Sequence, residues 1–563
     1  MTSTGTTLVD RIDLHAAERP RASAYTLLED GADVSVTRTF AELRSRALTI
    51  ASWLAPRDVR GRPVLLMIRD GLQFIEAFLG CLYAGAIAVP MAFPRPQRQL
   101  SALRSIIACS DARAVLASRA ETQPVMDVLS DVAGAATWLF MEDAVATGTL
   151  PHRPVPGDIA FLQYTSGSTS SPKGVVVTHG NLMCNEAAIQ TAMALDRNTV
   201  FVGWLPLFHD MGLIGNVLQP LYLGIHCVLM PPVAFLQRPI RWLAAISKYR
   251  ATVSGGPNFA YDLCVDRTHA EQRRELDLSS WKVAFNGAEP VKAQTLERFS
   301  KAFAGAGFRR SAFYPCYGMA ENTLIVTGVK SGTEPVTDDI EVSGRVTHKR
   351  VVSCGSAVVG TRVAIVDPDT RWRLPDGEIG EIWVAGDSVA RGYYRAARET
   401  EETFGARLAT GEGAFLRTGD LGYLREGHLF VTGRIKELII IRGRNHYPQD
   451  LEETAAGANP LLVRGAGAAV ALESERAVVA IVHELTREGW RSADRNEVAE
   501  DVREAIAQAH GVTVGPVFLI RPGSLPRTSS GKIRRALCRQ LIESGEFETA
   551  LSHSGAEAGV SVA

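Results

Sequence analysis

The 563-residue chain has little that would mark a zinc-binding or nucleic-acid-binding protein. Its eight cysteines are scattered and none belongs to a CxxC pair, so we expect no zinc site and interpret the thiols as reduced core residues. Lysine and arginine number 60 against 61 aspartates and glutamates, and this balance argues against a nucleic-acid-binding protein, whose surface would be strongly basic.

Long apolar segments are also scarce. The N-terminus, MTSTGTTLVDRIDLH, lacks a basic region followed by an apolar run, so no signal peptide is visible and we expect a cytoplasmic location. The most apolar segment, residues 74–93, contains Glu76, Gly80, Gly85 and Pro90. These residues favour a core helix that runs into a strand, and we expect no integral membrane association.

What the chain does contain is a regular alternation of helix and strand patterns. Thr39 followed by Glu42 predicts a capping box, and apolar residues repeat behind it at helical spacing. Residues 63–70 form a short apolar run typical of a buried strand, and a helix and another strand are expected over residues 72–93. The alternation continues to about residue 430 and predicts an α/β fold with parallel or mixed sheets covered by helices.

The last hundred residues have the pattern of a smaller unit. Strands are expected at residues 468–472, 477–485 and 516–520, with an intervening helix that begins at Asp494. A final helix is expected from Lys532 onward, with a basic start. The small polar residues after about position 546 predict a disordered tail.

Residues 164–174 read YTSGSTSSPKG, a small and polar stretch between two apolar runs. Glycines let backbone N–H groups turn inward, hydroxyls add hydrogen-bond donors, and Lys173 adds a compact cation. We interpret the stretch as an anion-binding loop between two strands. Pro172 stands where a Walker-type loop needs its second glycine, so this is not the common nucleotide loop. For this stretch taken alone, a flexible surface loop is an equal alternative.

Seven further motifs follow this loop. They are PLFHDMG (206–212), NGAEPV (286–291), YGMAEN (317–322), GEIWVAGDSVARGYY (380–394), RTGDLGY (417–423), GRIKELIIIRGRN (433–445) and PRTSSGKIRR (526–535). With the loop, their order resembles the adenylate-forming superfamily of acyl-CoA synthetases, peptide-synthetase adenylation domains and luciferases. The resemblance implies a large N-terminal domain (1–433), a hinge (434–437), a small mobile α+β C-terminal domain (438–545) and the tail (546–563).

The resemblance also implies the chemistry. A carboxylate attacks the α-phosphorus of ATP, which yields an acyl-adenylate and pyrophosphate, and the mixed anhydride then reacts with a thiol. Because the first step gathers negative charge, it needs cations and aimed donors more than a protein nucleophile. ATP and Mg²⁺ are the expected cofactors. The residues expected to bind ATP or AMP are Thr165, Ser166, Gly167, Ser168, Thr169, Lys173, Asn286, Gly287, Ala288, Tyr317, Gly318, Met319, Asp420 and Arg434.

The resemblance implies a separate role for each of these residues. The loop Thr165–Lys173 would hold the β- and γ-phosphates, and Glu321 would coordinate Mg²⁺, a cation that prefers oxygen ligands. Tyr317 would stack on adenine, while Asp420 would accept both ribose hydroxyls and Arg434 would also reach the ribose. Taken alone, these residues are equally compatible with a surface glutamate, a packing tyrosine and a turn aspartate.

The expected catalytic residues are Lys532, His209 and Glu321. Lys532 would cross from the small domain to the substrate carboxylate and the α-phosphate. His209 would lie near that carboxylate or gate an acyl tunnel. In isolation, Lys532 suits a solvent-facing helix start and His209 a structural histidine, but the ordered motifs favour function. Asp210 keeps an amino acid substrate as a minor alternative, because amino acid adenylation domains place an aspartate near this position.

Two stretches narrow the resemblance to the fatty acyl-AMP ligases, which pass the acyl group to an acyl carrier protein. They are LPLFHDMGLIGNVLQPLYLG (205–224) and IRGRNHYPQDLE (441–452). Residues 328–352 fit an insertion that restrains the small domain in that subfamily, and Lys436 is the expected hinge residue. His446 is also compatible with a turn before a helix at Pro448. The expected acceptor-selecting loop consists of Arg444, Asn445, His446 and Tyr447.

The sequence therefore predicts an ATP-dependent ligase for a medium- or long-chain fatty acid. The acyl group would pass to the phosphopantetheine thiol of a separate acyl carrier protein, or of a carrier domain in a polyketide or peptide synthase, because nothing after residue 540 resembles a carrier attachment site. A fatty acyl-CoA ligase is the main alternative. A non-catalytic binding or scaffold protein is a third, and the joint presence of Lys173, Glu321, Asp420 and Lys532 argues against it.

Overall fold

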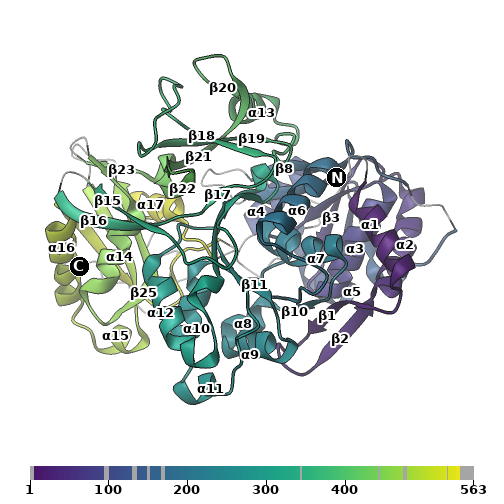
Figure 1. Ribbon diagram of the computed structural model, residues 1–563, viewed down its shortest axis with the longest axis horizontal. Helices are drawn as coiled ribbons and strands as arrows, with labels where there is room; N and C mark the ends of the chain where they lie inside the picture. Colours follow the sequence, from purple (N-terminus) through teal and green to yellow (C-terminus); the bar gives the residue numbers. More distant parts are fainter. Residues whose placement is uncertain are drawn as a thin grey trace.

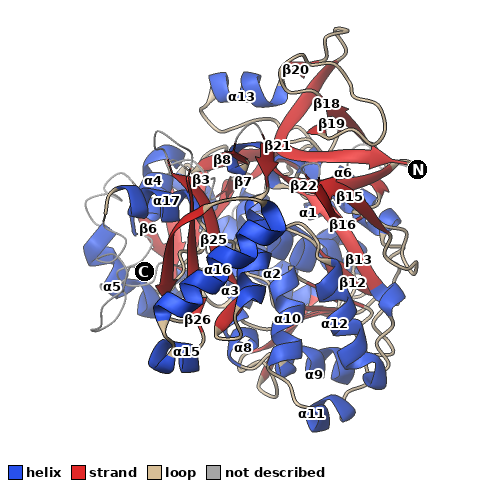
Figure 2. Ribbon diagram, turned by 90° about the vertical axis from the view of Figure 1, so that its left-hand side faces the viewer, coloured by secondary structure: helices blue, strands red, loops and turns tan. Residues whose placement is uncertain are grey.

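The computed structural model describes residues 6–93, 100–129, 136–148, 152–165, 172–342, 345–441, 444–472, 478–528 and 531–545. The predicted tail (546–563) lies outside these residues. The described part contains two large sheets with helices packed around them, an antiparallel sheet and a three-stranded C-terminal sheet (Figures 1 and 2). The predicted α/β fold class is confirmed.

The largest sheet is parallel through its centre and antiparallel at both edges. Its central strands are short and buried, as expected when helices cover both faces of a parallel sheet. In spatial order the strands are β17 (Ser356–Ala357), β14 (Ile325–Gly328), β13 (Phe313–Gly318), β12 (Val283–Asn286), β11 (Val253–Gly255), β9 (Phe201–Gly203), β10 (Cys227–Leu229), β1 (Ser23–Leu28) and β2 (Ser35–Thr39).

The second large sheet is parallel except for its last pair, β7 and β8, which is antiparallel. The expected strand at residues 63–70 is β3 of this sheet, and the apolar segment 74–93 becomes helix and then strand, as predicted. In spatial order the strands are β6 (Thr137–Phe140), β5 (Ala114–Ala117), β3 (Pro63–Met67), β4 (Ile87–Pro90), β7 (Ile159–Thr165) and β8 (Lys173–Thr178).

The remaining strands form smaller sheets. A hairpin of β15 (Thr337–Val342) and β16 (Arg345–Val352) comes first. The antiparallel sheet contains β18 (Thr361–Val366), β19 (Gly380–Gly386), β20 (Ala406–Arg407), β21 (Gly413–Arg425) and β22 (His428–Arg434). The C-terminal region contains the pair β23 (Ile439–Ile441) and β24 (Arg444–His446), and the sheet β25 (Leu462–Leu472), β26 (Val478–Leu485) and β27 (Val514–Ile520).

Helices surround these sheets (Figure 2). The α-helices are α1 (Leu8–Glu18), α2 (Phe40–Leu54), α3 (Gly71–Ala84), α4 (Leu100–Ser110), α5 (Arg119–Leu129), α6 (His179–Ala192), α7 (Gln219–Leu223), α8 (Pro232–Gln237), α9 (Ile240–Tyr249), α10 (Asn258–Asp266), α11 (Ala270–Arg274), α12 (Ala293–Phe303), α13 (Ala397–Phe404), α14 (Pro448–Ala458), α15 (Arg487–Ser492), α16 (Arg495–His510) and α17 (Arg535–Glu543). Short helical turns are η1 (Ala55–Arg57), η2 (Met141–Asp143), η4 (Ala304–Ala306), η5 (Arg310–Ala312), η6 (Ala320–Asn322) and η7 (Ile435–Glu437), and η3 (Met211–Leu218) is a π-helix.

Helix α2 illustrates why the local sequence folds as it does. The Glu42 N–H donates to Thr39 Oγ1 at 3.2 Å, and the Thr39 N–H donates to Glu42 Oε2 at 2.8 Å, so the predicted capping box is confirmed. Gly80 of α3 allows close packing against this helix, because a Cβ there would lie 2.5 Å from Ile50 Cγ2. Such a contact is possible only for glycine.

The C-terminal elements have hydrophobic cores of their own. One cluster joins residues from Ile439 to Leu519, and a second joins residues from Ala468 to Cys538. The main core instead gathers buried residues from Leu8 to Leu429. Figure 1 shows α14, α15, α16 and β25 on the side of the molecule away from α1 and α2.

The last helix differs from its prediction. Helix α17 begins at Arg535, and Lys532 lies before it. Thr528 and Lys532 instead form two hydrogen bonds with each other, in which the Thr528 N–H donates to the Lys532 carbonyl at 2.7 Å and the Lys532 N–H donates to Thr528 Oγ1 at 3.1 Å. Gly531 has a φ of +87°, a left-handed conformation that ends any helical path at this point.

Helix length and polarity also bear on the membrane prediction. Among the residues that the structure describes, no helix is both long and apolar enough to cross a bilayer.

Candidate active site

The predicted phosphate loop joins two strands, as expected. Strands β7 and β8 pair so that Thr165 lies opposite Lys173. Ser166, Gly167, Ser168 and Thr169 lie outside the described residues. The Lys173 ammonium group lies 4.9 Å from the centroid of the Tyr393 ring, within cation–π distance. Lys173, the charged residue of the predicted loop that the structure describes, therefore contacts an aromatic side chain.

Two neighbouring parallel strands bring the predicted base-binding residues together. Asn286 ends β12, Tyr317 and Gly318 end β13, and Asn286 pairs in register with Pro315. Gly287, Ala288 and Met319 come directly after these strands. The carboxyl ends of parallel strands meet at one edge of a sheet, where ligands bind in α/β folds. Asn286 is fully buried, and its Oδ1 atom has no partner among the described atoms.

Asp420 joins that edge to the antiparallel sheet. It accepts a 2.7 Å hydrogen bond from the Tyr317 hydroxyl at Oδ2, and Arg434 Nε lies 2.8 Å from its Oδ1 atom. The Asp420 charge raises the pKa of Arg434, while burial and then Asp420 raise the pKa of Tyr317. The tyrosine hydroxyl therefore stays protonated as a donor, and three residues predicted separately form one polar cluster.

His209 and Asp210 form a second charged pair at the start of the π-helix η3. His209 Nδ1 lies 2.6 Å from Asp210 Oδ1, and the Met211 N–H donates to the same oxygen at 2.7 Å. Burial opposes ionisation of Asp210, but His209, together with Lys532 and the Met211 N–H, lowers the pKa of Asp210 to about 2. Asp210 is thus a permanent anion at neutral pH, and its main partner is a residue that was predicted to be catalytic.

Lys532 approaches these groups from the C-terminal region. A Cβ on the preceding Gly531 would lie 3.4 Å from Phe259 Cε1, so Gly531 lies against α10. Although Lys532 is solvent-exposed as a residue, burial of its ammonium group lowers its pKa. Arg434 also lowers this pKa, whereas Asp210 and Asp420 raise it. The lysine therefore lies within electrostatic reach of both polar clusters.

Glu321, the predicted metal ligand, lies in η6 beside a tyrosine that the sequence analysis did not single out. The Tyr393 hydroxyl donates to Glu321 Oε1 at 3.0 Å. Burial raises the pKa of Glu321. Tyr393 belongs to the GYY stretch that closes the 380–394 motif, and this signal was present in the sequence without an assigned role.

The hinge and acceptor segments lie in the C-terminal region. Lys436 is the middle residue of η7, and the adjacent Glu437 pairs with Arg535 at 2.7 Å. In the β23–β24 hairpin, Arg444 and Asn445 are exposed, whereas His446 and Tyr447 are buried. The helix expected at Pro448 does begin there, as α14. The four predicted acceptor residues therefore fall into an exposed pair and a buried pair.

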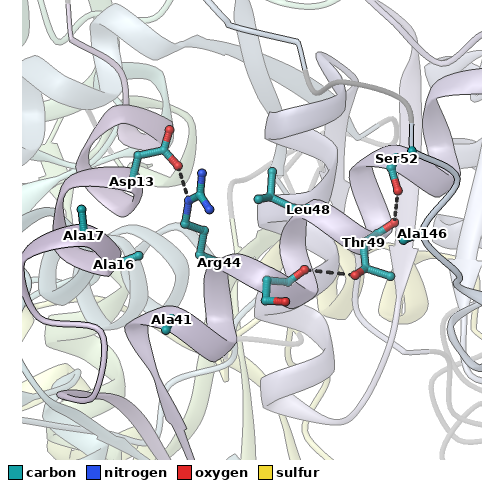
Figure 3. A pocket seen from close by; sticks show the side chains of 11 residues that line it. Asp13, Ala16, Ala17, Ala41, Arg44, Leu48, Thr49, Ser52 and Ala146 are labelled. Carbon is teal, nitrogen blue, oxygen red and sulfur yellow. Dashed lines mark hydrogen bonds and ion pairs between the residues drawn. The ribbon is translucent and has the colours of Figure 1, made fainter.

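A groove of about 620 Å³ lies elsewhere, between α1 and α2 (Figure 3). None of its lining residues belongs to the predicted site. Its main charged group, Asp13, already accepts from Arg44 Nε at 2.6 Å and from the Tyr83 hydroxyl at 2.8 Å. The residues of the predicted site lie in the charged clusters described above and not in this groove.

Comparisons with known proteins identify the family of the chain. The family model for AMP-binding enzymes matches residues 12–394. The chain is 42% identical over 570 residues to the medium-chain-fatty-acid–acyl-carrier-protein ligase JamA of Moorena producens, covering 96% of each chain. It is 37% identical over 598 residues to the corresponding ligase TtuA of Teredinibacter turnerae, covering 95% of this chain and 93% of that one.

A solved structure extends the likeness to three dimensions. The fatty acid AMP ligase from Legionella pneumophila is 39% identical, covers 96% of both chains and has a TM-score of 0.74. The family model, the relatives and the solved structure show that the chain belongs to the AMP-binding enzyme family, the adenylate-forming superfamily that its motifs resemble.

Proposed function

We propose that this protein activates a medium- or long-chain fatty acid with ATP and passes the acyl group to the phosphopantetheine thiol of a separate acyl carrier protein. The observation that carries the proposal is the Tyr317–Asp420–Arg434 cluster with Lys532 in its electrostatic field. The named activities of JamA and TtuA support the fatty acid and carrier-protein parts. The protein would release pyrophosphate in the first step.

In this proposal the residues divide between nucleotide binding and charge stabilisation. Asp420 and Arg434 would orient the ribose, and the sheet edge after β12 and β13 would receive the base. Lys532 would stabilise the negative charge that develops as the carboxylate attacks the α-phosphorus, and an aimed cation is worth most at that moment. His209, held by Asp210, would orient the fatty acid carboxylate. Lys173 and the loop before it would hold the departing phosphates.

We further propose that Glu321 holds Mg²⁺ together with the phosphates of ATP. No group of three or more His, Cys, Asp or Glu side chains in the described ranges could hold a metal ion unaided. This fits Mg²⁺, which usually binds through one or two carboxylates plus substrate phosphates and water. When bound, Mg²⁺ would supply neutralisation of phosphate charge, and Glu321 would position it.

For the second step we propose that residues 438–545 rotate as a domain about the hinge at residues 434–437, relative to residues 1–433. The hairpin β15–β16 occupies most of the proposed insertion (328–352). It packs against the two strands that precede the hinge, since the Tyr423 hydroxyl of β21 donates to Asp338 Oδ2 at 2.6 Å and Val351 packs against Tyr423 of β21 and Phe430 of β22. A hairpin attached to the strands that precede the hinge is well placed to restrain the rotation.

The acceptor is the part of the proposal that most needs a test. Purified protein would receive dodecanoic acid, ATP and Mg²⁺, with pyrophosphate release as the first readout. Coenzyme A or a phosphopantetheinylated carrier protein would then be added, and acyl transfer would be followed by mass spectrometry. We expect acyl-carrier formation and little acyl-CoA. Rapid acyl-CoA formation would establish the alternative acceptor, and absence of pyrophosphate release would overturn the adenylation step itself.

A further inference from the structure

Residues 390–394 form a short segment, here called the strap, that joins the phosphate-loop strand to Glu321. The Arg391 N–H donates to the Val176 carbonyl at 3.0 Å, and the Val176 N–H donates to the Gly392 carbonyl at 2.9 Å. At the other end, the Ala390 N–H donates to the Glu321 carbonyl at 2.9 Å. The strap therefore fixes the separation of β8, which begins at Lys173, from η6, which contains Glu321.

Tyr393 is the strap side chain that contacts charged groups on both sides. Its ring lies under the Lys173 ammonium group at 4.9 Å, and its hydroxyl donates to Glu321 Oε1 at 3.0 Å. One rigid side chain thus contacts the cation proposed for the phosphates and the anion proposed for the metal. Lys173 contacts the face of the ring and Glu321 accepts from the hydroxyl, so each charge has its own contact with the tyrosine.

Contacts with helix α13 fix the orientation of Tyr393. The Tyr393 N–H donates to Thr400 Oγ1 at 2.9 Å, and the Phe404 ring packs edge-on against the Tyr393 ring with centroids 5.2 Å apart. Gly392 allows this arrangement, because a Cβ there would lie 2.3 Å from Thr400 Cγ2. Helix α13, which contains Thr400 and Phe404, therefore determines where the tyrosine hydroxyl points.

We propose that Tyr393 is a positioning residue that sets Lys173 and Glu321 at a fixed spacing before the nucleotide arrives. The inference rests on the proposed adenylation function. A site in which a lysine and a glutamate are both mobile would first pair them with each other, and the nucleotide and its cation would have to break that pair. Tyr393 prevents this competition by giving each charged group its own partner on one ring.

The two contacts of Tyr393 can be separated by substitution. Tyr393→Phe keeps the ring below Lys173 and removes the hydroxyl that holds Glu321. Tyr393→Leu removes both contacts. Tyr394→Phe is the matched control, because it makes the same chemical change at the next residue. Circular dichroism and thermal melting of each variant would verify that it is folded.

The first readout is equilibrium binding of ATP without Mg²⁺, in the presence of a chelator, by titration calorimetry. Lys173 contributes to this binding and the metal does not. We expect Tyr393→Phe to match the unmodified protein, whereas Tyr393→Leu should bind roughly threefold more weakly or worse, as expected for a lost cation–π contact.

The second readout is ATP–pyrophosphate exchange with dodecanoic acid, measured over ranges of MgATP and of free Mg²⁺. For Tyr393→Phe we expect the KM for MgATP to rise about tenfold, the typical effect of losing a hydrogen bond to a charged group, with kcat changed by less than about threefold. Tyr394→Phe should behave like the unmodified protein.

The outcomes separate the two proposals. If the unmodified protein exchanges no pyrophosphate, the proposed function fails. If it does, and both Tyr393 variants equal it in Mg²⁺-free binding and in KM, then Tyr393 has no positioning role. A fall in kcat with unchanged KM and unchanged binding would also overturn the inference, because spacing the two charges acts on nucleotide binding.

Discussion

The Tyr317 hydroxyl donates a 2.7 Å hydrogen bond to Asp420, a residue 103 positions later in the chain. The other carboxylate oxygen of Asp420 pairs with Arg434. The end of a parallel strand in the largest sheet and two antiparallel strands of another sheet therefore meet at one carboxylate. Asp420 is almost fully buried between these two donors, and the cluster offers a direct test of nucleotide binding.

Asp420→Asn keeps the shape of the side chain and removes its charge. Arg434 then loses its partner and the ribose loses a charged acceptor. We expect the KM for ATP in pyrophosphate exchange to rise roughly 10- to 100-fold, since hydrogen bonds to charged groups contribute about 1.5–3 kcal/mol.

Asp338→Asn is a matched control for this change. Asp338 also accepts from a tyrosine, Tyr423, and pairs with an arginine, Arg425, but it lies in the β15–β16 hairpin. We expect it to leave the KM for ATP unchanged. Equal effects of the two substitutions on KM would show that the Asp420 cluster has no special part in nucleotide binding.

Lys532→Ala should nearly abolish adenylation while the protein stays folded. An aimed charge in an active site typically accounts for a factor of about 10²–10³ in rate, and Lys532 is an exposed residue whose truncation leaves no cavity in a core. Pyrophosphate exchange measures the rate, and thermal melting measures the fold. Lys301→Ala, an exposed lysine on α12, serves as control. Retention of more than about a tenth of the exchange rate would remove Lys532 from the chemistry.

Lys436→Pro should separate the two half-reactions. Proline fixes its own φ and restricts the residue before it, so η7 could no longer absorb a rotation of the C-terminal region. We expect acyl-adenylate to form at a near-normal rate and transfer to the carrier protein to fall. Single-turnover measurement of each step checks this. Lys436→Ala is the control, because it removes the charge and keeps the backbone free to rotate at this residue. Normal transfer by the proline variant would refute the hinge assignment.

We expect substitutions at exposed and at buried residues of the proposed acceptor-selecting loop to have different effects. Arg444 is exposed, so Arg444→Ala should lower transfer to the carrier protein and leave pyrophosphate exchange unchanged. His446 is buried, and burial lowers its pKa, so His446→Ala should mainly destabilise the fold, by about 1–3 kcal/mol. Comparing transfer rates with unfolding free energies distinguishes the two. A transfer defect for His446→Ala at full stability would instead place that side chain against the acceptor.

His179 gives a pH-dependent prediction. It begins α6, is buried, and burial lowers its pKa from 6.5 to about 4. Between these values the unfolded chain binds a proton that the folded protein does not. Stability is therefore complete above pH 6.5 and is lost as the pH falls toward 4, by about 2 kcal/mol at pH 5. His179→Gln removes this titration. Urea unfolding at pH 7 and pH 5 should show a smaller acid loss for the variant, and equal losses would contradict the burial effect.

Much of the fold could be predicted because the information was local. The Thr39 capping box, the buried strand at residues 63–70 and the helix at Asp494 depend on residues close together in the chain, and each was found where it was expected. The final helix was placed too early for a local reason as well. Its basic sequence is compatible with a helix from Lys532, but Lys532 accepts a hydrogen bond from the Thr528 N–H and follows the left-handed Gly531, so the helix begins later, at Arg535.

The sequence by itself determined the family, the order of the motifs and the residue types that the chemistry needs, because each motif is a short contiguous stretch. Only the tertiary structure decided which of those residues meet. Asp420 joins Tyr317 and Arg434, Lys532 comes within electrostatic reach of Asp210, and Tyr393 lies between Lys173 and Glu321. These contacts join residues that are far apart in the chain. They depend on the order of the strands in the sheets and on which side chains remain at the sheet edges once the core is packed. No single motif contains that information.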